Sequence, residues 1–173
     1  FRIAVNISQV QFREPDFHHQ LLEIAAECAV APHCVELELT ESVASGNVAE
    51  TSEKIQALRQ LGYSVALDDF GTGFSSLSLL QKLSVDRLKI DRSFVSGENA
   101  QANGMVVANT IMALARQLNI KTIAEGIETE DQRSQLAAVG CEEGQGYLCS
   151  KPIDEGQFLQ LLSQQTKNVK DCL

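Results

Sequence analysis

Short apolar runs alternate with longer segments of helical periodicity along this chain of 173 residues. The runs are typical of strands, and the longer segments repeat apolar positions with the period of a helix that packs on one face. Strands are predicted at residues 2–6, 35–39, 63–67, 85–90, 121–125 and, from a weaker pattern, 145–149. Helices are predicted near residues 15–29, 48–61, 75–83, 98–118, 129–139 and 154–164. This alternation predicts parallel strands joined by right-handed helical crossovers.

Two α/β architectures compete for this pattern, an open doubly wound sheet and a β/α barrel. No glycine-rich phosphate-binding fingerprint follows the first strand, which weakens the dinucleotide-binding form of the open sheet. About six βα units are fewer than the usual eight of a TIM-type (β/α) barrel, so a barrel requires further strands upstream. The chain begins at Phe1 in a strand-like run, without an initiator methionine. That abrupt start fits an incomplete barrel that belongs to a longer protein.

Polar side chains stand at the end of every predicted strand. Because the carboxyl ends of parallel strands meet at one face of an α/β fold, these side chains are expected to form a single polar pocket. A cluster of carboxylate and amide oxygens without His or Cys is typical of sites for Mg²⁺ or Mn²⁺. The residues are, in strand order, Asn6, Glu38 and Glu41, Asp68 and Asp69, Lys89 and Asp91, Glu125 and Glu128, and Gln145.

Asp68 and Asp69 are adjacent, and adjacent residues of a regular strand point to opposite faces. They can share a site only where the strand gives way to a loop, which the sequence FGTG at residues 70–73 marks. One aspartate could then bridge two cations, and two cations stabilise both the attacking and the leaving oxygen of a phosphoryl transfer. Lys89 adds a positive charge that can orient a nucleophilic water or offset developing charge.

Charge and composition narrow the classes of function further. A formal net charge of −9 argues against general binding of DNA or RNA, because no basic stripe is present to neutralise phosphates. The five cysteines include no CxxC pair and are expected to be reduced thiols of a cytoplasmic domain. The sequence shows neither a signal-peptide pattern nor an apolar run of membrane-spanning length.

An ordered series of motifs resembles the EAL-domain family, the bacterial phosphodiesterases of cyclic di-GMP. The series covers essentially the whole chain, and its loop DDFGTGFSSL is highly specific. The motifs are VNIS (5–8), ELTE (38–41), DDFGTGFSSLSLL (68–80), LKID (88–91), AEGIE (124–128) and QGYLCSKP (145–152). The resemblance implies a β/α barrel with one unusual antiparallel strand. It also implies hydrolysis of one phosphodiester of cyclic di-GMP, dependent on two Mg²⁺ or Mn²⁺ ions, giving linear pGpG.

The resemblance also implies a metal-binding role for five residues. Asn6, Glu38 and Asp68 match ligands of the first metal. Asp68 matches a bridge to a second ion, which Asp69 and Glu125 would also hold.

The resemblance implies that the remaining site residues contact the hydrolytic water, stabilise a loop or support the bound substrate. Lys89 matches the lysine that contacts the hydrolytic water, with Glu125 as an alternative general base. Glu41 matches the acid that stabilises the loop after Asp69. Three further residues match polar residues of the family that support the site or the bound dinucleotide: Asp91, Glu128 and Gln145.

One departure from the family pattern is large, because the tripeptide Glu-Ala-Leu occurs nowhere in the chain. In the family it lies on the first strand, upstream of Asn6, and its glutamate is a ligand of the first metal. Residues 1–173 are therefore interpreted as the C-terminal portion of a single EAL domain, expected to be inactive alone. Upstream chain, or a second copy in a homodimer, is expected to cover the exposed sheet edge.

Two alternatives to the enzyme stay open from the sequence. One is a receptor that binds cyclic di-GMP without hydrolysing it, and the other is a protein-interaction module that has lost the ligand. The retained acids and lysine favour the enzyme lineage. The parent chain is expected to carry upstream sensory or GGDEF-type domains, and upstream segments could anchor it to a membrane.

Overall fold

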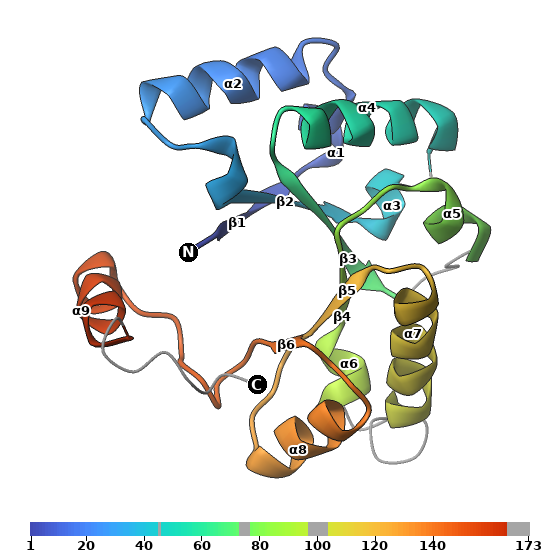
Figure 1. Cartoon of the computed structure of the whole chain (residues 1–173), viewed down its shortest axis with the longest axis vertical. Helices are drawn as coiled ribbons and strands as arrows, with labels where there is room; N and C mark the ends of the chain where they lie inside the picture. Colours follow the sequence, from blue (N-terminus) through green and yellow to red (C-terminus); the bar gives the residue numbers. More distant parts are fainter. Residues whose placement is uncertain (45, 73–76, 97–103, 166–173) are drawn as a thin grey trace.

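The computed structural model describes residues 1–44, 46–72, 77–96 and 104–165, and its core is one parallel sheet. The sheet curls through an arc, as Figure 1 shows, and its strands follow chain order. All five pairings between neighbouring strands are parallel. The strands are β1 (Ile3–Ile7), β2 (Val35–Thr40), β3 (Ser64–Phe70), β4 (Arg87–Ile90), β5 (Lys121–Ala124) and β6 (Glu143–Gly144). This confirms the prediction of an incomplete TIM-type (β/α) barrel of about six βα units.

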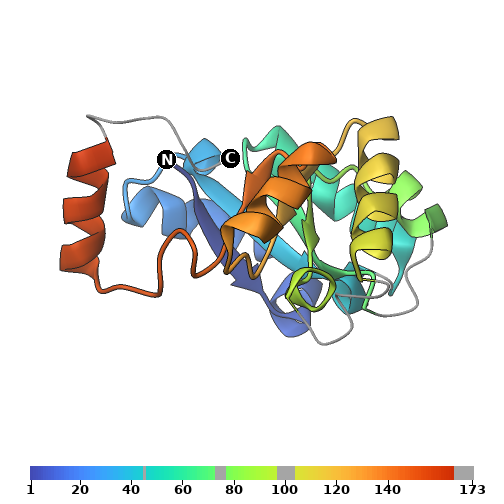
Figure 2. The ribbon, with the colours of Figure 1, turned by 90° about the horizontal axis from the view of Figure 1, so that it is seen from below.

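Helices follow each strand and surround the outer side of the arc (Figures 1 and 2). They are α1 (Gln9–Arg13), α2 (Phe17–Glu27), η1 (Pro32–Cys34), α3 (Glu41–Ala44), α4 (Val48–Gln60), α5 (Leu77–Lys82), α6 (Arg92–Val95), α7 (Met105–Gln117), α8 (Glu130–Ala138) and α9 (Glu155–Gln165). The last helix lies apart from the others, where the Phe158 ring packs edge-on against that of Phe1, with centroids 6.0 Å apart. No helix among the described residues is both long and apolar enough to span a bilayer.

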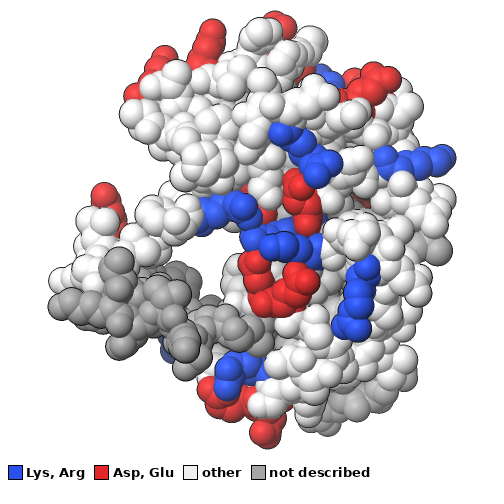
Figure 3. Space-filling model, in the orientation of Figure 1, with Lys and Arg blue, Asp and Glu red and all other residues white. Residues whose placement is uncertain are grey.

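The two faces of the sheet differ in polarity because strand residues alternate in direction. The outer face carries fully buried aliphatic side chains that pack under the helices: Leu37, Leu39, Val65, Leu67, Leu88 and Ile90. The intervening residues point into the concave side, where a hollow of about 610 Å³ is lined by polar groups such as Glu38, Arg87 and Gln145. Lysine, arginine and acidic side chains gather around this hollow in Figure 3. The functional side chains therefore occupy a polar inner layer supported by an apolar outer one.

β1 forms an incompletely covered edge of the sheet. Among the described residues it pairs only with β2, and its outward side chains Ile3 and Val5 remain 50% and 41% exposed. An apolar groove of about 370 Å³ runs between this edge and α2. Such an edge is a liability in water unless further chain covers it.

The sixth strand is displaced from its predicted position, and the prediction of residues 145–149 was wrong. The strand is Glu143–Gly144, and a turn follows it, in which the amides of Cys149 and Ser150 donate to the Gly146 carbonyl. Leu148 packs against the core from this turn rather than from a strand, which explains the misleading apolar pattern.

The other predicted elements are confirmed within a few residues. Thr129 and Gln132 form the predicted capping box at α8. The Asn47 side chain caps α4 by accepting from the Glu50 amide. The antiparallel strand implied by the family resemblance is not among the six strands of the described chain. Residues 75–76 and 98–103, which were predicted to be helical, lie outside the described residues.

Candidate active site

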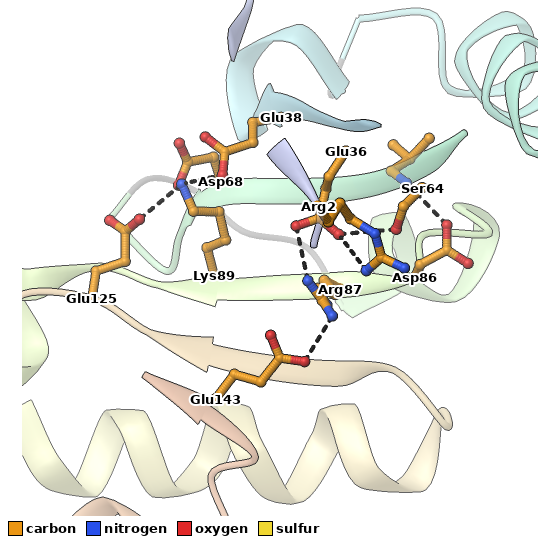
Figure 4. A network of polar contacts seen from close by, with 11 residues as sticks. Arg2, Glu36, Glu38, Ser64, Asp68, Asp86, Arg87, Lys89, Glu125 and Glu143 are labelled. Carbon is orange, nitrogen blue, oxygen red and sulfur yellow. Dashed lines mark hydrogen bonds and ion pairs between the residues drawn. The ribbon is translucent and has the colours of Figure 1, made fainter. Parts of the chain in front are cut away.

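Lys89 lies at the centre of three carboxylates from three strands, as Figure 4 shows. Its Nζ is 2.8 Å from Glu38 Oε1, 3.1 Å from Asp68 Oδ1 and 2.8 Å from Glu125 Oε1. The side chains are almost enclosed, with exposed fractions of 5% for Lys89, 9% for Glu38, 12% for Asp68 and 18% for Glu125. We call these four residues the carboxyl-end cluster, because each lies at or near the carboxyl end of its strand.

Strand alternation and register bring the cluster together. Glu38 on β2 and Lys89 on β4 both point into the concave side, since the residues flanking each are buried in the outer core. Glu125 directly follows β5, and its amide donates to the carbonyl of Ile90 at 3.0 Å, which continues the ladder beyond the strand. The prediction that the polar strand ends converge in one pocket is thus confirmed for these residues.

An irregular backbone brings Asp69 to the same end of the sheet as Asp68. Asp69 has a positive φ of 55°, and the register of β3 against β4 shifts between Leu67 and Phe70. The Asp69 amide donates to Asp68 Oδ1 at 2.9 Å. Because the left-handed residue breaks the two-residue alternation, adjacent aspartates can serve one site, as the sequence required. The break comes within the last residues of the strand rather than after it.

Burial and charge set the protonation of this cluster. Burial alone would lower the pKa of Lys89, but hydrogen bonds to Glu125 and Glu38 and the charges of Glu125 and Asp68 raise that pKa above its ordinary value. Burial raises the pKa of Glu125, although the hydrogen bond from Lys89 opposes the change. Burial and the charges of Asp68 and Asp91 likewise raise the pKa of Asp69. Lys89 is therefore a permanent cation and donor at neutral pH.

The carboxyl-end cluster carries more negative than positive charge. Three carboxylates surround one ammonium, and the exposed Asp69 lies beside them. No group of three or more His, Cys, Asp or Glu residues in the described ranges is arranged around a common point that could hold a metal ion. The oxygen donors themselves are of the kind that Mg²⁺ and Mn²⁺ prefer.

The remaining predicted residues lie near the ends of strands of the same sheet. Asn6 pairs in register with Glu38 across β1 and β2. Glu41 begins α3 directly after β2. The carboxylate of Asp91 caps α6, where its Oδ1 accepts from the Ser93 amide at 2.9 Å. Gln145 lines the concave hollow.

Glu128 lies just before α8, and its described polar contact is made by its backbone. Its amide donates to Gln132 Oε1 at 2.8 Å, at the start of α8. The structure therefore places Glu128 beside a helix cap. Within the described residues, no hydrogen bond or ion pair joins the Glu128 side chain to the carboxyl-end cluster.

Comparison with known proteins places these features in a family. Residues 1–152 match the sequence model of the EAL domain. The chain belongs to the EAL domain family. It is 38% identical over 152 residues to the cyclic di-GMP phosphodiesterase NbdA of Pseudomonas aeruginosa, covering 88% of this chain and 19% of NbdA. It is 35% identical over 159 residues to the bifunctional diguanylate cyclase/cyclic di-GMP phosphodiesterase MucR of the same species, covering 92% of this chain and 23% of MucR.

Solved EAL structures share the fold. The PaMucR phosphodiesterase in complex with c-di-GMP superposes with a TM-score of 0.85 at 35% identity, covering 91% of this chain and 64% of that one. Klebsiella pneumoniae BlrP1 has been solved with cy-diGMP and either calcium or manganese. It superposes with a TM-score of 0.75 at 28% identity, covering 85% of this chain and 38% of that one. The chain thus spans only part of the length of its relatives.

A second polar layer on the inner face of this EAL domain was not predicted from the sequence. Glu36, Arg87 and Glu143 also point inward and form ion pairs. A signal was available, because Glu36 and Arg87 lie two residues before Glu38 and Lys89 and must share their face.

Proposed function

We propose that this chain is the C-terminal portion of an EAL domain that hydrolyses cyclic di-GMP to linear pGpG. The observation that carries the proposal is the convergence of Glu38, Asp68 and Glu125 on Lys89 at the carboxyl ends of three parallel strands. Active sites of β/α barrels lie at this end. The family membership and the c-di-GMP phosphodiesterase relatives support the same conclusion.

The donor set fits two divalent cations, and Mg²⁺ or Mn²⁺ are the proposed ones. Asn6, Glu38 and Asp68 would hold the first ion, and Asp68, Asp69 and Glu125 the second. Two such ions supply Lewis-acid stabilisation of the charge that develops during phosphodiester cleavage. The surplus of carboxylates over ammonium groups supports this assignment, because a buried cluster with excess negative charge is costly without further cations.

Lys89 and Glu125 differ in their protonation, which divides the two proposed catalytic roles between them. Lys89 stays protonated because its pKa is raised, so it can donate a hydrogen bond to the attacking water but cannot accept that water's proton. The Glu125 carboxylate lies 2.8 Å from Lys89 Nζ, so a water held by Lys89 could pass its proton to Glu125. We therefore assign water positioning to Lys89 and the general base to Glu125.

Two assays on the full-length protein that carries this chain distinguish the proposed enzyme from its alternatives. Calorimetry with cyclic di-GMP measures binding, and chromatography after incubation with Mn²⁺ measures pGpG. A phosphodiesterase would bind cyclic di-GMP and also produce pGpG. Asp91 and Gln145 are the proposed supports of the bound dinucleotide. Binding without product would identify a receptor, and the absence of both would identify an interaction module.

Residues 1–173 alone are expected to produce no pGpG in the same assay. Without an upstream Glu-Ala-Leu strand, the first metal site keeps only Asn6, Glu38 and Asp68, and the open β1 edge leaves the substrate wall incomplete. Misplacement by about 1 Å can already cost ~100-fold in rate. Turnover by the isolated chain near that of the full-length protein would mean that a second copy supplies the missing ligand or that the ligand is dispensable.

A further inference from the structure

Arg87 links two strands that are not neighbours in the sheet. Its Nη1 is 3.2 Å from Glu36 Oε1 on β2, and its Nη2 is 2.7 Å from Glu143 Oε1 on β6. The exposed fraction of the Arg87 side chain is 14%, and that of Glu36 is 6%. A guanidinium is planar and presents its donors in a rigid fork, so two carboxylates held by it are fixed relative to each other.

The residues of this link lie directly beneath the carboxyl-end cluster. Figure 4 shows the two groups side by side, joined by β2, which carries Glu36 and Glu38, and by β4, which carries Arg87 and Lys89. Each member of the link is two residues before a site residue on the same strand or its direct continuation, so both point into the concave side. The pairs are Glu36 and Glu38, Arg87 and Lys89, and Glu143 and Gln145.

We propose that Arg87 is a positioning residue that sets the distance across the arc between Glu38, Lys89 and Gln145. Because β3, β4 and β5 separate β2 from β6, backbone pairing fixes these two strands to each other only through three intermediates. The fork of Arg87 joins them directly. Removing it should let the sheet change its curvature and move the metal ligand Glu38 away from Lys89. This inference rests on the proposed function, since it concerns the ligands of the same site.

The surroundings of Glu36 make the proposal testable without unfolding the protein. The Ser64 hydroxyl donates to Glu36 Oε2 at 2.9 Å, and Arg2 Nη1 lies 3.6 Å from the same oxygen. Glu36 therefore keeps polar partners when Arg87 is replaced. We call Arg2, Glu36, Arg87 and Glu143 the amino-end cluster.

The test compares Arg87→Met with Arg59→Met in the full-length protein, using Mn²⁺ titration calorimetry and steady-state kinetics. Arg59 is a matched control, because it is an arginine paired with Asp86 at 2.9 Å that touches neither Glu36 nor Glu143. Arg87→Met should weaken Mn²⁺ binding about tenfold and lower kcat by a similar factor, the size typical of losing a partner that orients ligands. Arg59→Met should leave both unchanged, and Arg87→Lys should restore part of the loss.

Several outcomes separate the proposal from the proposed function. If Arg87→Met binds Mn²⁺ as tightly as the wild type, Arg87 has no positioning role. If the wild type binds Mn²⁺ but produces no pGpG, the phosphodiesterase assignment fails, while weaker Mn²⁺ binding by Arg87→Met still supports the link. If Arg87→Met does not fold, Glu143→Ala replaces it, because the Glu143 side chain is 38% exposed and alanine leaves no acceptor for Arg87. Unchanged Mn²⁺ affinity of Glu143→Ala would then overturn the proposal.

Discussion

The inner face of the sheet carries two polar clusters that share the strands β2 and β4 but differ in charge. In the amino-end cluster, the arginines Arg2 and Arg87 face the carboxylates of Glu36 and Glu143. In the carboxyl-end cluster, three carboxylates share the single ammonium of Lys89. The first cluster is balanced within itself, whereas the second has a surplus of negative charge.

This difference distinguishes a structural network from the proposed metal site. Balanced ion pairs with satisfied hydrogen bonds need no further ion, and removing one partner destabilises the fold because the other is left buried and unpaired. A buried surplus of carboxylates is costly unless additional cations or protonation offset the charge. We therefore expect substitutions in the carboxyl-end cluster to change chemistry most, and those in the amino-end cluster to act through stability and through the position of the site residues.

The largest effect is expected from Asp68→Asn, which removes the charge of the proposed bridging ligand. Hydrolysis of cyclic di-GMP by the full-length protein should fall below detection. Mn²⁺ should also bind more weakly, because the Asp68 carboxylate is proposed to bind both ions. Product chromatography and calorimetry measure the two effects. Wild-type turnover by Asp68→Asn would remove Asp68 from the metal site.

Lys89→Met should lower kcat strongly while leaving the affinity for cyclic di-GMP largely in place. Its proposed partner is the attacking water rather than the dinucleotide. The same variant should bind Mn²⁺ at least as tightly as the wild type, because an ammonium no longer competes for Glu38, Asp68 and Glu125. Kinetics and Mn²⁺ calorimetry together test this. Full turnover, or a marked loss of Mn²⁺ affinity, would contradict the assignment of Lys89.

The sequence predicted the sheet and the convergence of polar strand ends because both follow from local rules. Alternation of apolar runs and helical periods identified the parallel order, and the end of each strand identified Glu38, Lys89 and Glu125. The direct contact of Lys89 with three carboxylates could not be predicted, since it depends on the curvature of the sheet. The link through Arg87 was missed for the same reason, because it joins strands that are distant in both sequence and sheet order.

A smaller effect is expected at Gly126, which follows Glu125 and has a positive φ of 68°. A Cβ there would collide with the Cβ of Arg92, and the left-handed backbone itself costs an L-residue about 1–2 kcal/mol. Gly126→Ala should therefore lower the free energy of unfolding by at least that amount and reduce kcat by displacing Glu125. Gly156→Ala is the matched control, because a Cβ at Gly156 would only contact Asp154 Oδ1 at 3.4 Å. Urea denaturation that gives equal stabilities for the two variants would contradict this account of the loop.

The smallest effect concerns Asp91, whose carboxylate caps α6. Burial raises the pKa of Asp91, but hydrogen bonds from Ser93 and Arg92 outweigh burial and hold that pKa below its ordinary value. The stability that Asp91 contributes is therefore present above its unfolded pKa of about 3.9 and is lost as the pH falls through the lower folded value. Asp91→Ala should cost about 1 kcal/mol at neutral pH, and the difference should shrink in acid. Asp91→Asn keeps a capping oxygen but has no carboxylate to protonate. The stability difference between Asp91→Asn and Asp91→Ala should therefore not depend on pH, and a pH dependence of that difference would count against the explanation.

The most direct test of the central claim is anomalous diffraction from crystals of the full-length protein grown with Mn²⁺. The account predicts two Mn²⁺ peaks within coordination distance of Glu38, Asp68 and Glu125, with Lys89 Nζ further from these carboxylates than the 2.8–3.1 Å described above. No Mn²⁺ peak at the carboxyl-end cluster, with Lys89 still bound to all three carboxylates, would contradict it.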